Sequence, residues 1–224
     1  MELYLDTANI NHIREVAGYG FITGVTTNPS LLAKEDPTID IKQRILEIHS
    51  LVGGHLSVEV NSLETQGMIS EADEILSWFP DATIKIPMLP AGLGAVKQLY
   101  DREIATNVTL VFNPTQALAA ANAGATYVSV FMGRLDDIAI DSYALMNEIC
   151  ELWDKQGLEA MLIAASIRNP NHITQAAKAG CDIATVPYNV LMQSLKHPLT
   201  TAGIDAFVAD YDRMQTERTK VLAK

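Results

Sequence analysis

The chain has 224 residues, of which 48% are hydrophobic and 19% are charged, with a formal net charge of −11 and a pI near 4.8. This length predicts one globular domain over residues 1–224, large enough for a single α/β barrel. The acidic balance argues against a nucleic-acid partner and against an anionic membrane surface, because both are bound through basic patches. Two cysteines, Cys150 and Cys181, provide neither a disulfide framework nor a metal-ligand set.

The first ten residues, "MELYLDTANI", lack the basic and apolar regions of a signal peptide. No apolar run approaches the roughly 20 residues that a membrane-spanning helix needs. We therefore expect a soluble, cytoplasmic protein with no membrane partner.

Short apolar runs alternate with segments of helical periodicity along the chain. Runs rich in β-branched residues predict strands over 3–6, 21–27, 56–60, 83–86, 107–111, 127–131, 161–166 and 182–186. Most of these runs lack regular alternation of polar and apolar residues, as expected when both faces of a strand are buried. Eight such strands alternating with helices predict a single (β/α)8 TIM barrel.

Three helices are predicted to begin at an Asn-Pro pair, at 28–29, 113–114 and 169–170. Asparagine caps free N–H groups, and proline fits the first helical position. The segment "AGLGA" at 91–95 lacks the full glycine fingerprint of a nucleotide site and is interpreted as a turn.

A long C-terminal helix is predicted over about 199–222. Apolar side chains recur along it at helical spacing: Ile204, Phe207, Val208, Tyr211 and Met214. The helix either folds back on the barrel or packs on another subunit.

Polar residues end or follow nearly every predicted strand. In a (β/α)8 barrel these positions meet at one mouth, where the active site lies. Each residue alone has an ordinary explanation, such as helix capping, but together they predict one site: Asp6, Thr26, Asn28, Glu59, Asn61, Lys85, Asn107, Thr109, Ser129, Arg134, Ser166 and Arg168.

Lys85 lies between Ile84 and Ile86 in a run that predicts a buried strand. Burial disfavours the ammonium, which leaves a fraction of the neutral amine that attacks carbonyls. Asp6 and Glu59, also at strand ends, can move the protons that imine formation and C–C cleavage require. The alternative is a structural lysine–carboxylate pair. The two carboxylates and several hydroxyls, expected at the same level of the barrel as the amine, favour a Schiff base.

Arg134, Ser166 and Arg168 come from the late part of the predicted barrel, where this fold often holds phosphate. Two guanidinium groups and a hydroxyl suit a phosphate dianion. The five histidines fall in predicted helices or loops and none lies at a predicted strand end, so we expect no metal and no cofactor.

Four segments resemble the transaldolase family, and specifically its short bacterial branch of small transaldolases and fructose-6-phosphate aldolases. They are "LYLDTA" (3–8), "GVTTNPSLL" (24–32), "IKIP" (84–87) and "AASIRN" (164–169). The resemblance implies a class I mechanism on sugar phosphates, without a cofactor. Lys85 would form the Schiff base, Asp6 and Glu59 would transfer protons, and Thr109 would help to hold a water molecule.

The resemblance also implies the substrate contacts. Asn28, Asn107 and Ser129 would hydrogen-bond the dihydroxyacetone fragment, and Thr26 and Phe131 would be further substrate-binding residues. Arg134, Ser166 and Arg168 would bind the phosphate.

Two positions separate the branches of the family. Glutamate on the third strand and phenylalanine after the sixth resemble transaldolases, whereas glutamine and tyrosine resemble the aldolases. Here these positions are Glu59 and Phe131, and Asn107 with the Ser-x-Arg of 166–168 is also similar to transaldolases. A transaldolase is therefore the first hypothesis, and a fructose-6-phosphate aldolase is the second.

A third hypothesis, of another class, is a non-catalytic barrel that binds phosphosugars through the arginine–serine site alone. Short members of the family that this chain resembles assemble into rings, so the resemblance implies a homo-oligomer, a pentamer or a decamer, with the terminal helix reaching a neighbour.

Overall fold

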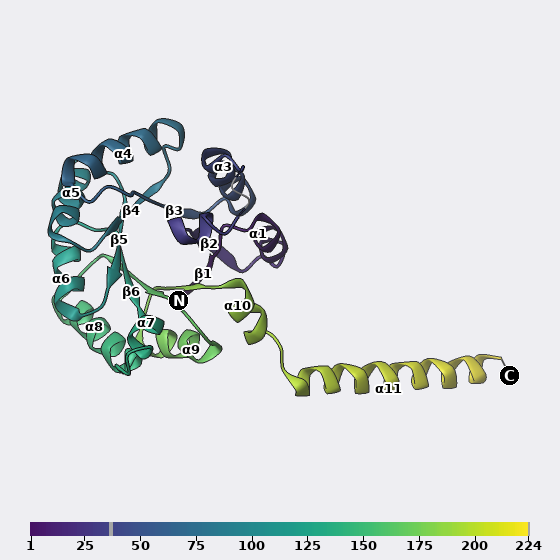
Figure 1. The fold of residues 1–224 in the computed structure, drawn as a ribbon. Coiled ribbons are helices and arrows are strands. Elements are labelled where there is room, and N and C mark those ends of the chain that lie inside the picture. The colour runs from purple at the N-terminus through teal and green to yellow at the C-terminus, as the bar shows by residue number, and fades with distance from the viewer. Residues whose placement is uncertain (36–37, 224) are drawn as a thin grey trace.

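Eight parallel strands close into a barrel in the computed structural model of the chain, which describes residues 1–35 and 38–223. Each strand pairs with the next, and β8 closes on β1 (Figure 1). The predicted (β/α)8 barrel is confirmed, and every predicted strand overlaps an observed one. The strands are β1 (Glu2–Asp6), β2 (Ile22–Thr26), β3 (His55–Glu59), β4 (Thr83–Pro87), β5 (Thr106–Val111), β6 (Tyr127–Phe131), β7 (Met161–Ala165) and β8 (Ile183–Val186).

Helices follow the strands, and most of them surround the barrel, whereas the last one does not (Figure 1). They are α1 (Ile10–Ala17), α2 (Pro29–Leu32), α3 (Ile41–Val52), α4 (Thr65–Trp78), α5 (Pro90–Tyr100), α6 (Pro114–Asn122), α7 (Met132–Asp136), α8 (Ser142–Gln156), α9 (Pro170–Ala179), α10 (Tyr188–Ser194) and α11 (Pro198–Leu222).

The Asn-Pro pairs begin helices as predicted. Asn28, Asn113 and Asn169 are the N-caps of α2, α6 and α9, and each side chain accepts a hydrogen bond from the backbone N–H three residues later. After α6, Gly124 has φ of 97°, and an added Cβ would clash with the Tyr100 ring. The pairs thus fix where three strand-to-helix connections turn.

The predicted turn at 91–95 is wrong, because this segment lies inside α5. Pro90 occupies the first turn of the helix, where its missing N–H has no cost. An added Cβ on Gly92 would clash with the carbonyl oxygen of Pro87. The glycine is therefore explained by close packing of α5 on the end of β4.

Strand register brings the polar residues of the mouth side by side. Glu59 pairs with Lys85, and Lys85 pairs with Asn107, across β3, β4 and β5. Asp6 pairs with Thr26 across β1 and β2. Register partners on neighbouring strands project to the same side, so the members of each of these two rows face the same side of the barrel wall.

The part of the barrel interior near the amino ends of the strands holds apolar and aromatic side chains. Tyr4, Ile163 and Ile183 form a small buried cluster that is separate from the main core between strands and helices. His55 stacks on Tyr4 with ring centroids 5.0 Å apart and meets Tyr127 edge-on at 4.5 Å. The prediction that all histidines lie in helices or loops is wrong for His55, which is the first residue of β3.

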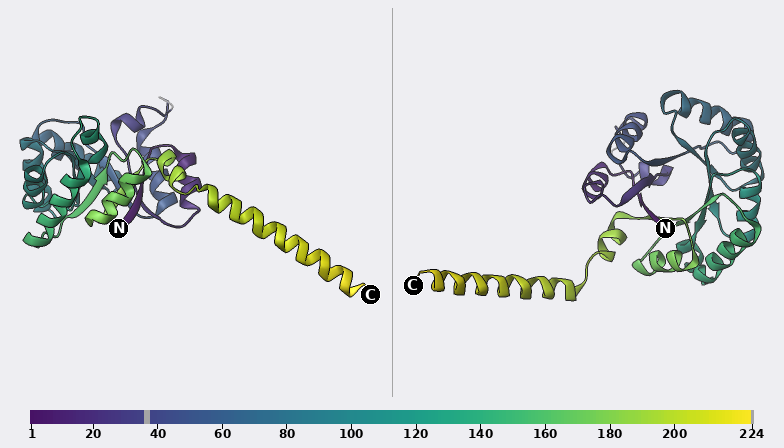
Figure 2. Two further views of the ribbon diagram at one scale, coloured as in Figure 1. Left: turned by 90° about the horizontal axis from the view of Figure 1, so that it is seen from below. Right: turned by 180° about the vertical axis from the view of Figure 1, so that it is seen from behind.

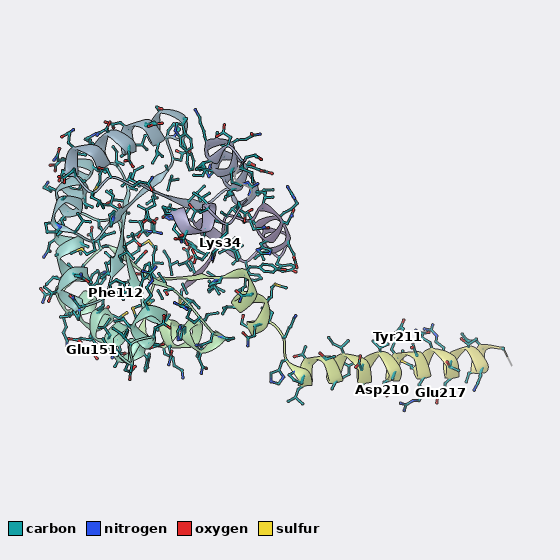
Figure 3. The ribbon with its side chains drawn as sticks, in the orientation of Figure 1. Lys34, Phe112, Glu151, Asp210, Tyr211 and Glu217 are labelled. Carbon is teal, nitrogen blue, oxygen red and sulfur yellow. The ribbon has the colours of Figure 1, made fainter. Side chains whose placement is uncertain are left out.

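The C-terminal helix α11 projects away from the barrel in all the views (Figures 1 and 2). None of its residues, all of them described, is buried. Phe207 is 76% exposed, and Tyr211, labelled in Figure 3, is 58% exposed. The predicted helix is confirmed, whereas the alternative that it folds back on its own barrel is wrong.

Candidate functional site

A cavity of about 480 Å³ opens at the carboxyl ends of the strands. Every strand contributes to its lining, from Asp6 on β1 to Thr185 on β8. The predicted site residues other than Asn61 and Asn107 line it: Asp6, Thr26, Asn28, Glu59, Lys85, Thr109, Ser129, Phe131, Arg134, Ser166 and Arg168. The structure thus brings residues from all parts of the sequence to one cavity.

Lys85 does not reach out to bulk solvent. The residue is 5% exposed, and its Nζ lies 2.9 Å from Glu59 Oε2. Nζ also donates a hydrogen bond to the carbonyl oxygen of Thr27 at 3.0 Å. The amine is therefore held at a defined point of the cavity wall, directly beside a group that can take its proton.

Asp6 lies at the end of a line of hydroxyl groups. Thr26 Oγ1 donates to Asp6 Oδ1 at 2.9 Å and lies 2.6 Å from Thr185 Oγ1. Because the one proton of Thr26 is committed to Asp6, Thr185 must be the donor to Thr26. Burial raises the pKa of Asp6, and the positive charge of Lys85 opposes this rise without cancelling it.

Ser129 and Thr109 contribute hydroxyls from β6 and β5. Ser129 Oγ donates to Asn107 Oδ1 at 2.8 Å, while Asn107 itself is fully buried beneath the cavity lining. Thr109 Oγ1 is buried and has no hydrogen-bond partner in residues 1–35 and 38–223. Leu110, with φ of 63°, lies with Thr109 between Val108 and Val111, where the pairing of β5 with β6 is irregular. A free buried hydroxyl at a cavity wall suits a bound water or substrate oxygen.

Asn28 has a structural task besides its place in the cavity wall. Its Oδ1 accepts a hydrogen bond from Leu31 N at 2.9 Å, which caps α2. This bond leaves the amide group of Asn28 fixed at the rim of the cavity.

The side of the cavity formed by the segments after β6 and β7, here called the late side, carries the two arginines. The Arg134 guanidinium lies 5.0 Å from the centre of the Phe131 ring, and Arg168 pairs with Asp137 at 2.9 Å. Ser166 has φ of 58°, in the left-handed region that few non-glycine residues adopt. The side chain of Arg168 is 53% exposed. Two cations and a hydroxyl thus face the cavity from α7 and from the loop after β7.

His172 connects the two segments that carry the arginines. Its Nδ1 accepts a hydrogen bond from Arg168 N at 3.3 Å, and its Nε2 lies 2.8 Å from Asp136 Oδ2. Asp136 belongs to α7, the same short helix as Arg134. The histidine therefore ties the loop after β7 to the helix after β6.

Several residues in the cavity wall or directly behind it were not predicted. Thr185 lies within a predicted strand, and a hydroxyl near the end of that strand was the available signal. Lys34, labelled inside the ring of helices in Figure 3, lines the cavity from the segment after α2 and had no signal of its own. His172 is buried in α9 and could be found only from its contacts.

No group of three or more histidine, cysteine or acidic side chains in the described part of the chain is arranged to hold a metal ion. Within the same residues, no helix combines the length and the apolarity that a bilayer-spanning segment needs.

A model of the transaldolase/fructose-6-phosphate aldolase family matches residues 3–224. The chain belongs to this family. The family predicted from the four sequence segments is thereby confirmed, and with it an enzyme of the transaldolase and aldolase type.

Three curated relatives of the chain share the description "Probable transaldolase". "Probable transaldolase" proteins of Desulfitobacterium hafniense and Clostridium botulinum are 53% and 52% identical over 96% of this chain, and these matches cover 100% and 99% of the relatives. One from Geobacillus thermodenitrificans is 51% identical, over 96% of this chain and 100% of the relative.

A solved structure of thiamine phosphate pyrophosphorylase from Pyrococcus furiosus is also similar, with a TM-score of 0.60 and 15% identity. The match covers 83% of this chain and 85% of that one. At this identity the likeness shows the fold alone.

Proposed function

We propose that the protein is a transaldolase that moves a dihydroxyacetone unit from a ketose phosphate to an aldose phosphate through a Schiff base on Lys85. The observation that carries the proposal is the buried amine in the cavity wall, with Nζ 2.9 Å from Glu59 Oε2. Fructose 6-phosphate and sedoheptulose 7-phosphate are the proposed donors, by resemblance to the family.

The first step needs a neutral amine. Any proton that Lys85 Nζ must lose lies beside Glu59 Oε2, which is 2.9 Å away, and the carbonyl oxygen of Thr27 is 3.0 Å away. Glu59 is close enough to accept that proton. The amine then attacks C2 of the open-chain ketose, and the resulting carbinolamine loses water to give an iminium ion.

Asp6 serves the bond-breaking step. It takes the proton of the C4 hydroxyl as the C3–C4 bond breaks, so that the aldose phosphate leaves and the electron pair remains as an enamine on Lys85. A second aldose phosphate adds to the enamine by the reverse steps. The raised pKa of Asp6 suits this exchange, because a proton-transfer group works best with a pKa near the operating pH.

The remaining polar groups divide between the two ends of the substrate. Asn28, Asn107 and Ser129 serve the dihydroxyacetone fragment, with Thr26 holding Asp6, and the free hydroxyl of Thr109 holds the water of imine formation.

The phosphate group of the substrate binds on the late side of the cavity. Arg134, Ser166 and Arg168 provide charge-assisted and neutral hydrogen bonds to its oxygens. They also supply the local positive potential that an anionic substrate needs in a chain of net charge −11.

The residues at the branch point favour transfer over release. Glu59 is a carboxylate, and Phe131 lacks a hydroxyl that could position a hydrolytic water. Phe131 also packs edge-on against Phe112, labelled in Figure 3, with ring centroids 5.6 Å apart. A drier enamine survives until a second aldose phosphate arrives.

An assay with and without an acceptor tests the proposal. We expect sustained turnover of fructose 6-phosphate only when erythrose 4-phosphate is present. Lys85→Arg should remove this turnover while circular dichroism shows an unchanged fold. Transfer that persists in Lys85→Arg would contradict the proposal.

The second candidate is a fructose-6-phosphate aldolase, since the matching family includes both activities. Rapid release of free dihydroxyacetone from fructose 6-phosphate alone would favour it. Phe131→Tyr should raise this release relative to transfer, and an unchanged ratio would contradict the account of the branch point.

We further propose that the protein is a single-domain cytoplasmic enzyme that assembles with copies of itself, as a pentamer or a decamer by family resemblance. The 25-residue helix α11 presents an unpartnered apolar stripe, with Phe207 and Val208 76% and 55% exposed. Light scattering should give a mass of several chains, and Phe207→Asp should lower it. A monomeric parent protein would contradict the proposal.

A further inference from the structure

A chain of hydrogen bonds runs inside the barrel beneath the cavity, from β3 across β5 to β6. His55 Nε2 lies 2.7 Å from Ser57 Oγ, and Asn107 Nδ2 donates to the same oxygen at 3.0 Å. Ser129 Oγ donates to Asn107 Oδ1 at 2.8 Å. Ser57 and Asn107 are fully buried, and Ser129 is the only one of these four hydrogen-bonded residues that lines the cavity.

The chain has a direction, because each hydroxyl has a single proton to donate. Asn107 donates to Ser57, so the proton of Ser57 is available for His55. A nitrogen that accepts this proton must be unprotonated, which places the imidazole proton on Nδ1. The cavity end of the hydrogen-bond chain has the same direction: Ser129 gives its proton to Asn107 and offers only an acceptor oxygen to the cavity.

The opposite state of His55 would remove the constraint that fixes this direction. A proton on Nε2 would be donated to Ser57, and Ser57 would then be free to donate its own proton to Asn107. If the Asn107 amide turned over to accept that proton, Ser129 would become a donor toward the cavity. The protonation of one imidazole, remote from the cavity wall, therefore decides whether the orientation of Asn107 and Ser129 is fixed.

The surroundings of His55 hold it in the neutral form. The ring is stacked on Tyr4 and lies edge-on to Tyr127, and Nδ1 is 3.5 Å from Thr83 Oγ1, which is within reach of an Nδ1–H. Burial lowers the pKa of His55 to about 4. At neutral pH the imidazole has one acceptor nitrogen and one donor nitrogen, as the chain requires.

We propose that His55 is a positioning residue for the substrate site: as a neutral imidazole with its proton on Nδ1, it orients Asn107 through Ser57 so that Ser129 accepts a hydrogen bond from a hydroxyl of the dihydroxyacetone unit. This inference rests on the proposed function, since it assigns that hydroxyl to the donor ketose. It adds to that proposal a residue that does not line the cavity.

A double-mutant cycle tests whether His55 acts through Ser129. His55→Phe keeps a ring between Tyr4 and Tyr127 but removes the acceptor. Loss of a hydrogen bond to substrate should lower kcat/KM for fructose 6-phosphate about 10- to 100-fold. In a Ser129→Ala background the same change should cost less than about 3-fold, because the group that it orients is gone. An equal loss in both backgrounds would overturn the proposal.

Conservative and remote variants separate positioning from a structural role. His55→Gln places an amide oxygen near the position of Nε2 and should keep kcat/KM within about 5-fold of the parent. A loss as large as that of His55→Phe would show that packing, not polarity, matters. His49→Phe, which changes a histidine of α3 beside Phe79, should leave the kinetics unchanged.

If His55→Phe does not fold, Ser57→Ala breaks the chain at its next member. It should show the same loss of kcat/KM, and the loss should again vanish in the Ser129→Ala background. Equal losses in both backgrounds would again count against the chain.

Nitrogen-15 NMR of the parent protein tests the hydrogen-bond chain without any assay of activity, because it reports which nitrogen of His55 carries the proton. At pH 7 we expect His55 to show a protonated Nδ1 and an unprotonated, hydrogen-bonded Nε2. A protonated Nε2 would overturn the inference even if transaldolase turnover is found. Absent turnover with the expected tautomer would overturn the proposed function and leave the chain in place.

Discussion

The two sides of the cavity hold their charges in opposite ways. On the early side, Lys85 is 5% exposed and is paired with a carboxylate whose side chain is only 15% exposed. On the late side, the side chains of Arg168 and its partner Asp137 are both more than half exposed. The early side is built from strand residues in register, and the late side is built from loops and the short helix α7.

This contrast teaches how one cavity can serve two tasks. Covalent chemistry needs an amine with a fixed proton acceptor and little water, which strand register provides. Capture of a phosphate dianion needs cations that a dissolved ligand can reach, and these tolerate exposure because arginine stays charged in water. Changes on the early side should therefore affect the chemical step, and changes on the late side should affect binding.

The largest effect is expected from Lys85→Met. Loss of the amine should lower kcat about 10,000-fold or more, because the proposed mechanism has no other amine that forms the Schiff base. Binding of inorganic phosphate, measured by calorimetry, should stay within about 3-fold, since the arginine side is untouched. Lys97→Met, which removes an exposed lysine of α5, is the matched control and should leave both quantities unchanged. A parallel loss of phosphate binding would break the division between the two sides.

Asp6→Asn should separate catalysis from stability. We expect kcat to fall about 100- to 10,000-fold, the usual range for a lost proton-transfer group. Because burial raises the pKa of Asp6 in the folded state, ionisation of this carboxyl costs stability. The cost is absent below the unfolded pKa of about 4 and grows as pH rises through the folded pKa.

Thermal unfolding from pH 4 to pH 8 measures this cost. The Tm of Asp6→Asn should equal that of the parent near pH 4 and should exceed it increasingly as the pH rises. A difference in Tm that shrinks with rising pH would contradict the sign of the shift.

Arg168→Ala should act on binding rather than on chemistry. Loss of a charge-assisted contact that is half exposed should raise KM for fructose 6-phosphate about 10-fold and change kcat less than about 3-fold. Unphosphorylated fructose should be turned over equally by variant and parent. A selective fall in kcat would show that Arg168 serves the chemical step instead.

The smallest effect is expected from Asp137→Asn. The carboxylate of Asp137 competes with phosphate for Arg168, and an exposed pair of this kind contributes about 1 kcal/mol or less. The variant should lower KM for fructose 6-phosphate about 2- to 5-fold. Asp210→Asn, which removes the partner of Arg213 on α11, is the control and should leave KM unchanged. A rise in KM would mean that Asp137 orients Arg168 productively.

The fold was predictable because its signals are local. Buried β-branched runs marked each strand to within one or two residues, and Asn-Pro pairs marked three helix starts. The prediction of a turn at 91–95 failed for a tertiary reason: Gly92 allows α5 to approach β4 closely, which local turn chemistry does not reveal. The sequence left the direction of α11 open between two alternatives, because an apolar stripe does not say what covers it.

Within the site, strand ends were a good guide to the cavity lining and a poor guide to what lies beneath it. Lys85, Glu59 and Asp6 each end or nearly end a strand, so their meeting followed from the barrel topology. His55 begins a strand and His172 lies in a helix, and both reach the site only through hydrogen bonds to intermediate residues. Such contacts depend on strand register and side-chain direction, which a single sequence does not specify.

The most direct test of the account is to trap the covalent intermediate. Borohydride added to the parent protein with fructose 6-phosphate should leave a reduced three-carbon unit on the protein, and peptide mass spectrometry should locate it on Lys85. An adduct on Lys34 or Lys97 instead, or no adduct during active turnover, would contradict the claim that the buried amine beside Glu59 forms the Schiff base.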